Sequence, residues 1–339
     1  MAEEKLPASV VANLKSRAIS QPLVEHIFTA DPSAHVFNGK IYIYPSHDIE
    51  AGVPFNDNGD HFDMQDYHVI SMDSPDSPAV DNGVALHVKD VAWAERQMWA
   101  PDAAHKNGKY YFYFPAKRKN GIFQIGVAIG DSPVGPFKPE PEAIKASYSI
   151  DPAVFEDNDG NYYMYFGGIW GGQLQKYRNN VYNEKNEEPK DQEPALAPRV
   201  ARLTDDMKEF AEAPREVIIL DEEGKEFVAC DYSRRFFEAS WMHKHNGTYY
   251  FSYSTGNTHF LCYATGDNPY GPFTYRGRIL NPVIGWTSHH SICDYEGKTY
   301  LFYHDSVLSE GITHLRSVKM TEITYREDGS IVTIDPYRP

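Results

Sequence analysis

The chain has 339 residues, of which 41% are hydrophobic and 14% aromatic, and tyrosine is the most frequent aromatic residue with 24 copies. The formal net charge of −16 argues against a nucleic-acid partner, which would require clustered lysine and arginine side chains. No stretch approaches the roughly 20 apolar residues that span a membrane, and the N-terminus lacks the apolar core of a secretory signal. We therefore expect no membrane contact and a cytoplasmic protein, or an exported one whose signal is absent from this sequence.

The cysteines do not form a recognisable framework. There are three of them, Cys230, Cys262 and Cys293, and no CxxC pair that would suggest a metal site. We predict buried free thiols at all three positions.

In chain order, residues 1–24 are predicted to form an N-terminal extension with a short helix that packs on the main domain. A turn containing glycine and followed by an aromatic-rich strand then recurs five times, and an Asn-Gly or Asp-Gly turn of this kind indicates a β-hairpin. The five copies occupy residues 37–44, 106–113, 157–165, 245–253 and 295–303.

The spacing of the hairpins predicts the fold. The copies lie about 50 to 90 residues apart, which leaves room for two more strands per unit, and four-stranded units repeated around an axis form a propeller. A second repeated element, at residues 130–139 and 266–275, supports this. The charged, apolar-poor stretch 183–194 is predicted to be a solvated insertion. We expect one all-β domain over residues 1–339, a five-bladed β-propeller.

Aligning the hairpins on their turn glycines brings four chemically active residues into register. Asp31, Asp151, Glu238 and His289 each lie eight or nine residues upstream of a turn glycine, where inner strands are expected to begin. The second unit offers residues 99–102 at this place. Equivalent positions in radially repeated units point at the central axis, so these side chains should share one cavity. A charge at the start of an apolar strand is costly unless it is paired or functional.

Three convergent carboxylates match the needs of glycoside hydrolysis. One carboxylic acid protonates the leaving oxygen, and a second, ionised carboxylate acts as base or nucleophile. A third negative charge can raise the pKa of the acid and keep it protonated near neutral pH. Any one of these residues alone would be interpreted as an ordinary turn or cap residue. Three in register across repeats favour a catalytic site.

These motifs resemble glycoside hydrolase family 43. The similarity lies in ADPSAHVFNGKIYIY, SIDPAVFEDNDGNYYMYFGG and FFEASWMHKHNGTYYFSYS, supported by WAPDAAHKNGKYYFYF and SHHSICDYEGKTYLFYHD, and it runs from about residue 25 to the C-terminus. It implies a five-bladed propeller and an inverting mechanism with Asp31 as general base, Glu238 as general acid and Asp151 as pKa modulator and orienter. Inversion implies base and acid carboxyl groups about 6.5–9.5 Å apart.

The resemblance also implies a metal. A histidine near the propeller axis binds Ca²⁺ in many members of the family, and His289 matches that position. Calcium prefers oxygen ligands, so one histidine completed by water is unusual on general grounds. The alternative is a hydrogen-bonded core histidine that orients Asp31 or Asp151. His290 follows on the same strand and should face the other way.

Four further residues are candidates for substrate binding, each with an alternative. Trp99 could stack on a sugar or belong to the core, and Asp63, like Asp66 near it, could bind hydroxyl groups or simply solvate a loop. Trp170, between glycine pairs, could wall one side of the pocket. Arg316 could bind hydroxyls or tune the acid, or have a surface or ring-closing role.

The resemblance is greatest to β-xylosidases and α-L-arabinofuranosidases, notably in SHDIEAGVPFNDNGDHFDMQDYHV and GWTSHHSI. It implies an exo-acting enzyme that releases xylose or arabinose from small oligosaccharides. The alternatives are an endo-arabinanase or galactanase of the same architecture, or a non-catalytic sugar-binding propeller, which would lack one of the carboxylates. The oligomeric state and the preferred sugar stay open.

Overall fold

The predicted hairpin turns form where the sequence places them. Both central residues have positive φ at Asn38-Gly39, Asn107-Gly108, Asn246-Gly247 and Glu296-Gly297, as the mirror-image turns that suit twisted hairpins require. At each of these four turns an inner strand and the next strand pair antiparallel.

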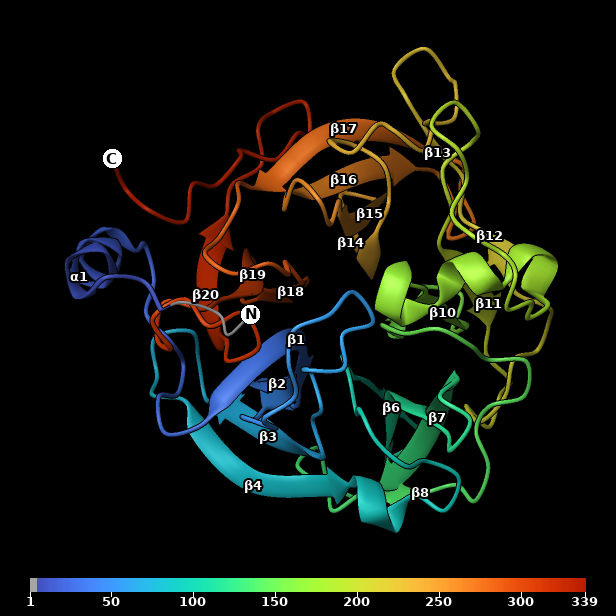
Figure 1. Cartoon of the computed structure of the whole chain (residues 1–339), viewed down its shortest axis with the longest axis horizontal. Coiled ribbons are helices and arrows are strands. Elements are labelled where there is room, and N and C mark those ends of the chain that lie inside the picture. Colours follow the sequence, from blue (N-terminus) through green and yellow to red (C-terminus); the bar gives the residue numbers. More distant parts are fainter. Residues whose placement is uncertain (1–4) are drawn as a thin grey trace.

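The computed structural model describes residues 5–339, and its strands form five sheets arranged around a central axis (Figure 1). The predicted five-bladed β-propeller is confirmed. The first sheet contains β1 (Phe28–Phe37), β2 (Lys40–Asp48), β3 (Asp66–Met72) and β4 (Val80–His87), and the second contains β5 (Asp102–Lys106), β6 (Lys109–Lys117), β7 (Phe123–Gly130) and β8 (Lys138–Pro139). The third contains β9 (Ala153–Glu156), β10 (Tyr162–Phe166), β11 (Arg199–Arg202) and β12 (Arg215–Glu216).

The last two blades depart from four antiparallel strands. The fourth contains β14 (Glu238–His245), β15 (Thr248–Ser254), β16 (Leu261–Gly266) and β17 (Phe273–Leu280), and β13 (Ile219–Leu220) adds to β17 in parallel. The fifth contains only β18 (His290–Tyr295), β19 (Lys298–Asp305) and β20 (Ser317–Ile323). Short 3₁₀ helices occupy Val88–Asp90, Trp170–Gly172, Leu174–Lys176 and Arg178–Asn180.

The many tyrosines join neighbouring blades. The hydroxyl of Tyr67 in the first blade donates to the carbonyl of Trp99 before β5, at 2.6 Å. Tyr113 in the second blade donates to Met207 beyond β11 at 2.9 Å, and Tyr165 in the third donates across to the fourth. A buried aromatic ring thus fills the space between two sheets while its hydroxyl satisfies a loop carbonyl, with a net gain of about 1 kcal/mol for each hydrogen bond.

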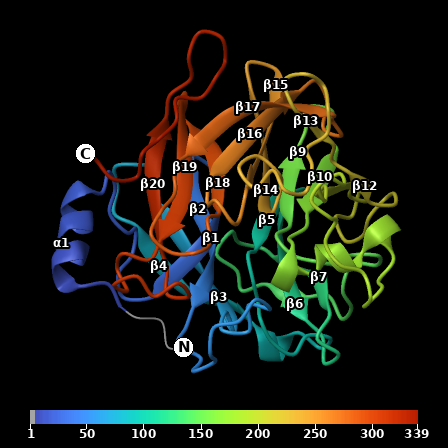
Figure 2. The same ribbon diagram turned by 45° about the horizontal axis from the view of Figure 1, so that its top comes forward.

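The N-terminal segment lies against the fifth blade. Leu23 donates its N–H to the carbonyl of Val318 at 2.8 Å, along the free edge of β20. The predicted short helix is α1 (Ala8–Arg17), which buries Val11 and Leu14 and lies at the periphery beside β20 (Figures 1 and 2). Residues 1–4 of the predicted extension lie outside the described part of the chain.

Two smaller predictions can be compared with the structure. All three cysteines are free thiols, but only Cys262 is buried, whereas Cys230 and Cys293 are partly exposed. The expectation of burial was therefore wrong for these two, which lie in a loop and in the second half of an inner strand. The charged stretch 183–194 is mostly exposed, as expected. Within residues 5–339, no helix combines the length and apolarity that a membrane crossing needs.

Candidate active site

The four axial candidates lie at the same end of the inner strands and line one cavity, of about 680 Å³ including its open mouth. Glu238 is the first residue of β14, while Asp151 and His289 stand just before β9 and β18. Asp31 is the fourth residue of β1 rather than its first, since β1 begins earlier than the turn alignment suggests. The four residues that the alignment of the repeats predicted to converge therefore do lie around one cavity.

The backbone is distorted at the carboxylates. Asp31 and Asp151 have φ of 48° and 57°, and Ala239, directly after Glu238, has φ of 63°. The pairing of β1 with β2 slips between Ala30 and Ser33, and that of β14 with β15 slips beyond Glu238. Bulges and left-handed residues of this kind re-aim side chains and are common at functional sites. Here they turn the carboxylates into the cavity.

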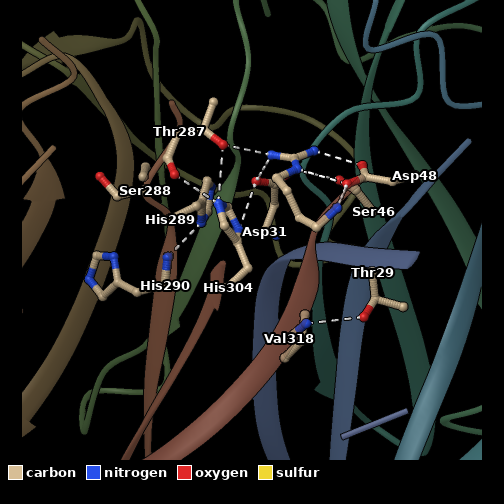
Figure 3. Close-up of polar contacts among 12 residues, drawn as sticks. Thr29, Asp31, Ser46, Asp48, Thr287, Ser288, His289, His290, His304 and Val318 are labelled. Carbon is tan, nitrogen blue, oxygen red and sulfur yellow. Dashed lines mark hydrogen bonds and ion pairs between the residues drawn. The ribbon is translucent and has the colours of Figure 1, made fainter. Parts of the chain in front are cut away.

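Asp31 is held by a dense hydrogen-bond network (Figure 3). Its Oδ1 accepts from Nη1 of Arg316 at 2.8 Å, and its Oδ2 accepts from the hydroxyl of Ser46 at 2.8 Å. Its backbone N–H donates to Nδ1 of His304 at 3.0 Å. Burial alone would raise the pKa of Asp31, but the charge of Arg316, together with His289, His304 and the hydrogen bond from Ser46, outweighs it and holds that pKa below its usual value. Asp31 is therefore ionised.

Arg316 is itself fixed by Asp48, at the end of β2. Its Nε and Nη2 donate to the two carboxylate oxygens of Asp48 at 2.8 and 2.7 Å, the bidentate arrangement that suits a guanidinium. Both side chains are almost fully buried, with exposed fractions of 3% and 0%. Arg316 lies just before β20, so this pair joins the last blade to the first. Of the roles considered for Arg316, the structure shows ring closure and contact with Asp31.

The pKa values of Glu238 and Asp151 are shifted upward, in the direction opposite to that of Asp31. Burial and the negative charge of Asp31 raise the pKa of Glu238 to about 8. Burial and repulsion from Glu238 and Asp31 also raise the pKa of Asp151. Asp151, however, accepts the N–H of Ala239 at 2.9 Å, which favours its ionised form. The proton that this pair retains near neutral pH is therefore assigned to Glu238.

The two neighbouring histidines face different ways. His289 lines the cavity, and its Nε2 lies 3.6 Å from Asp151 with no hydrogen-bond partner among the described residues. His290 turns away and pairs with the hydroxyl of Ser252 at 2.6 Å. Burial lowers the pKa of both rings, so both are neutral. This matches the expected alternation along the strand.

Aromatic side chains wall the cavity. Trp170, in a 3₁₀ helix at φ 55°, packs against Trp286 and Phe237 with ring centroids 5.5 and 5.3 Å apart. Its Nε1 donates to Glu188 at 2.5 Å, so the charged insertion reaches the cavity rim. Trp99 lines the cavity too, but its Nε1 donates to the carbonyl of Phe62 at 2.7 Å. Trp99 thus lines the cavity, and its stacking on a sugar stays a prediction.

Asp63 is placed differently from expectation. Among residues 5–339 the side chains that line the cavity do not include Asp63, although its neighbours Phe62 and Met64 are there. Its Oδ1 is buried without a hydrogen-bond partner, and burial raises its pKa. Direct contact between Asp63 and a sugar is not supported by this position.

Sequence reasoning missed several lining residues, because they come from loops that do not repeat between blades. They are Phe55, His61, Phe62, Trp286, Thr287 and Thr313. Trp286 stands only three residues before His289 within GWTSHHSI, so its proximity to an axial residue was the available signal.

The geometry can be set beside known proteins. The model of glycosyl hydrolases family 43 matches residues 22–331. The chain belongs to this family. A xylosidase/arabinosidase 43A of Humicola insolens is 62% identical over 324 residues, covering 93% of this chain and 99% of that protein. A xylosidase/arabinosidase of Bacteroides ovatus is also 62% identical, over 92% of this chain and 97% of its own length.

Solved structures of family 43 enzymes share the fold. A β-xylosidase/α-arabinofuranosidase from a compost microbial metagenome, in complex with xylotriose and in a calcium-free form, has a TM-score of 0.93 and 64% identity over 95% of this chain and 99% of its own. A family 43 enzyme of Xanthomonas citri in complex with xylose has a TM-score of 0.93 and 60% identity over 97% of this chain and 98% of its own.

Proposed function

We propose that this family 43 chain is an inverting exo-glycosidase that releases xylose or arabinose from the ends of xylo- or arabino-oligosaccharides. The observation that carries the proposal is a difference in protonation within one buried cavity. Asp31 is kept ionised by Arg316, whereas Glu238 has a pKa of about 8 and keeps its proton near neutral pH. The names and bound sugars of the relatives supply the substrate class.

The two groups divide the chemistry between them. Glu238 donates its proton to the leaving glycosidic oxygen as the bond to the anomeric carbon breaks. Asp31 takes a proton from a water molecule, which attacks that carbon from the opposite face. Arg316 and Ser46 hold Asp31 in position. Asp151, between Glu238 and His289, raises the pKa of Glu238 through its own negative charge when ionised.

The shape of the cavity favours a terminal sugar. Trp170 and Trp286 form one wall, and the loop around Gly59, which packs onto Trp99, borders the cavity at another place. Pockets enclosed on several sides hold the end of a chain, whereas endo-acting enzymes need an open groove. We therefore favour an exo-acting enzyme over an endo-arabinanase or galactanase.

We also propose that a calcium ion binds at His289. The buried Nε2 has no partner among the described residues and faces the carboxylates of the cavity, so a cation fits there with water as its other ligands. Nδ1 of His289 accepts the N–H of His290 at 2.8 Å, and the neutral ring then carries its proton on Nε2. A cation at Nε2 would require the ring proton to lie on Nδ1, so the hydrogen bond from the N–H of His290 would be lost. The cation would supply positive charge beside Asp151.

Hydrolysis of 4-nitrophenyl β-xyloside, 4-nitrophenyl α-arabinofuranoside and xylobiose by the wild type and Glu238→Ala tests the proposal. We expect the variant to lose about 10²- to 10⁴-fold on xylobiose and less on the nitrophenyl glycosides, whose leaving groups need little protonation. Glu223→Ala, an exposed carboxylate on a distant loop, is the matched control. Proton NMR of the first product from a β-xyloside should show α-xylose. Equal turnover by wild type and Glu238→Ala, or no turnover by either, would contradict the proposal.

A further inference from the structure

A second cluster of metal-binding side chain types lies in the first blade, outside the cavity. His47 on β2 and Asp66 and His68 on β3 offer ligand atoms that all lie within 4.8 Å of one another. Within residues 5–339 it is the only group of three or more such side chains that meets this distance. β2 and β3 are neighbouring strands (Figure 1), and His47 on β2 meets Asp66 and His68 on β3.

The three side chains already contact one another. Nδ1 of His47 lies 2.6 Å from Oδ1 of Asp66, and the rings of His47 and His68 have centroids 4.5 Å apart. Their side chains are exposed by 17%, 19% and 12%, so an ion can enter from solvent while much of each side chain stays fixed by the protein.

A carboxylate behind the cluster orients one of the histidines. Nδ1 of His68 lies 2.9 Å from Oδ1 of Asp81, which leaves Nε2 of His68 free to bind an ion. Asp81 is fixed in turn by the N–H of Gly83 at 2.8 Å and by Nε2 of His26 at 2.9 Å. A carboxylate that accepts the second ring N–H of a ligating histidine is the usual support of a protein metal site.

We propose that His47, Asp66 and His68 form a binding site for a divalent transition metal ion of the zinc class. Two imidazoles and one carboxylate suit Zn²⁺ and its neighbours, whereas Ca²⁺ and Mg²⁺ prefer sets of oxygen ligands. Zinc ligands in a tetrahedral site lie about 3.4 Å apart. Nδ1 of His47 and Oδ1 of Asp66, now 2.6 Å apart, would separate slightly, and any pair nearer the 4.8 Å limit would close. The remaining position is left to water. The site is distinct from the axial His289 and lies on β2 and β3, the two middle strands of the first blade.

The ion would tie β2 to β3 at a sensitive place. His47 directly precedes Asp48, which holds Arg316. Binding of an ion to the folded chain alone raises its melting temperature by mass action.

The test uses the full-length chain, stripped with a chelator that is then removed. Titration with Zn²⁺ by calorimetry should show about one ion per chain at this site, and Co²⁺ should give the intense visible absorption of a four-coordinate complex. His68→Gln should abolish both signals and the rise in melting temperature on adding Zn²⁺. Asp81→Asn should weaken binding by about 10- to 100-fold.

Two further variants serve as controls. His105→Gln removes a half-buried histidine from the next blade and should bind as the wild type does, and His289→Ala should also retain the signal, since it lies in the other site. Circular dichroism and xyloside hydrolysis show that His68→Gln is folded. No saturable Zn²⁺ binding by the wild type, equal binding by folded His68→Gln, or loss of binding in His289→Ala would each overturn the proposal.

Discussion

Arg316 donates to Asp31 and binds Asp48 through both carboxylate oxygens, so one guanidinium serves a catalytic candidate and a structural partner at once. The arginine stands in the last blade and both aspartates stand in the first. The charge that keeps Asp31 ionised is therefore supplied from across the junction where the ring closes.

Replacing this arginine should shift the acidic limb of the pH–rate profile. In Arg316→Met, Asp31 loses the charge that lowers its pKa, so its pKa rises and the acidic limb of kcat/KM moves to higher pH. Asp48 is left buried and unpaired, at a cost of about 3–5 kcal/mol in the free energy of unfolding. The double variant Arg316→Met/Asp48→Asn should regain much of that stability and keep the shifted limb. An unchanged limb in the folded double variant would contradict the assignment.

Because the pKa of Glu238 is raised in the folded protein, the free energy of unfolding should fall as pH rises. The carboxyl ionises at pH 4.5 when unfolded but near 8 when folded, so the unfolded chain releases the proton first and stability falls as pH rises between these values. Glu238→Gln removes this loss. We expect its melting temperature to exceed that of the wild type at pH 7 and to match it near pH 4. Exposed Glu327→Gln is the control. A lower melting temperature than wild type at pH 7 would show that the raised pKa is wrong.

Trp286 should contribute to substrate binding rather than to bond cleavage. It packs on Trp170 at the cavity wall, and an aromatic contact is worth about 0.5–1.5 kcal/mol, or about 2- to 12-fold in affinity. Trp286→Ala should raise KM for xylotriose by such a factor and change kcat less, and Trp286→Phe should restore most of it. A fall in kcat with an unchanged KM would place Trp286 in the chemistry instead.

One methyl group added at Gly171 should displace the loop that contains Asn58. A Cβ on Gly171 would lie 2.6 Å from the carbonyl oxygen of Asn58 and 3.1 Å from the Trp99 ring. Gly171→Ala must therefore push this loop away from the cavity. We expect a several-fold lower kcat/KM with little change in far-ultraviolet circular dichroism. Wild-type kinetics would show that the loop does not bind substrate.

Calcium dependence can be checked at His289. Prolonged chelation should lower both activity and melting temperature, and Ca²⁺ should restore them. In His289→Ala, added Ca²⁺ should change neither activity nor melting temperature, because the orphaned Nε2 is gone. If chelation leaves the wild type unchanged in both measurements, calcium has no part in this site.

The repeated hairpins made the fold and the axial residues predictable. The turn pairs fix where each inner strand lies, and equivalent positions in each blade converge by symmetry, so Asp31, Asp151, Glu238 and His289 could be placed together from spacing alone. Asp48 could not be found in this way, since its importance comes from Arg316, 268 residues away in sequence. The wall formed by Trp286 and Phe62 arises from loops without a repeat, and their packing depends on tertiary contacts that no local pattern encodes.

Thr29 lies two residues before Asp31, and its N–H donates to the carbonyl of Arg316. Arg316 of the last blade is therefore bound to the first strand by its backbone as well as by its side chain. A nascent chain whose final residues are still inside the ribosome cannot form these contacts. Enzymatic activity therefore reports on ring closure itself: a nick or deletion within the last blade should silence the enzyme even while the first four blades remain whole. Circular permutants opened between other blades, which keep these ends covalently joined, should retain it.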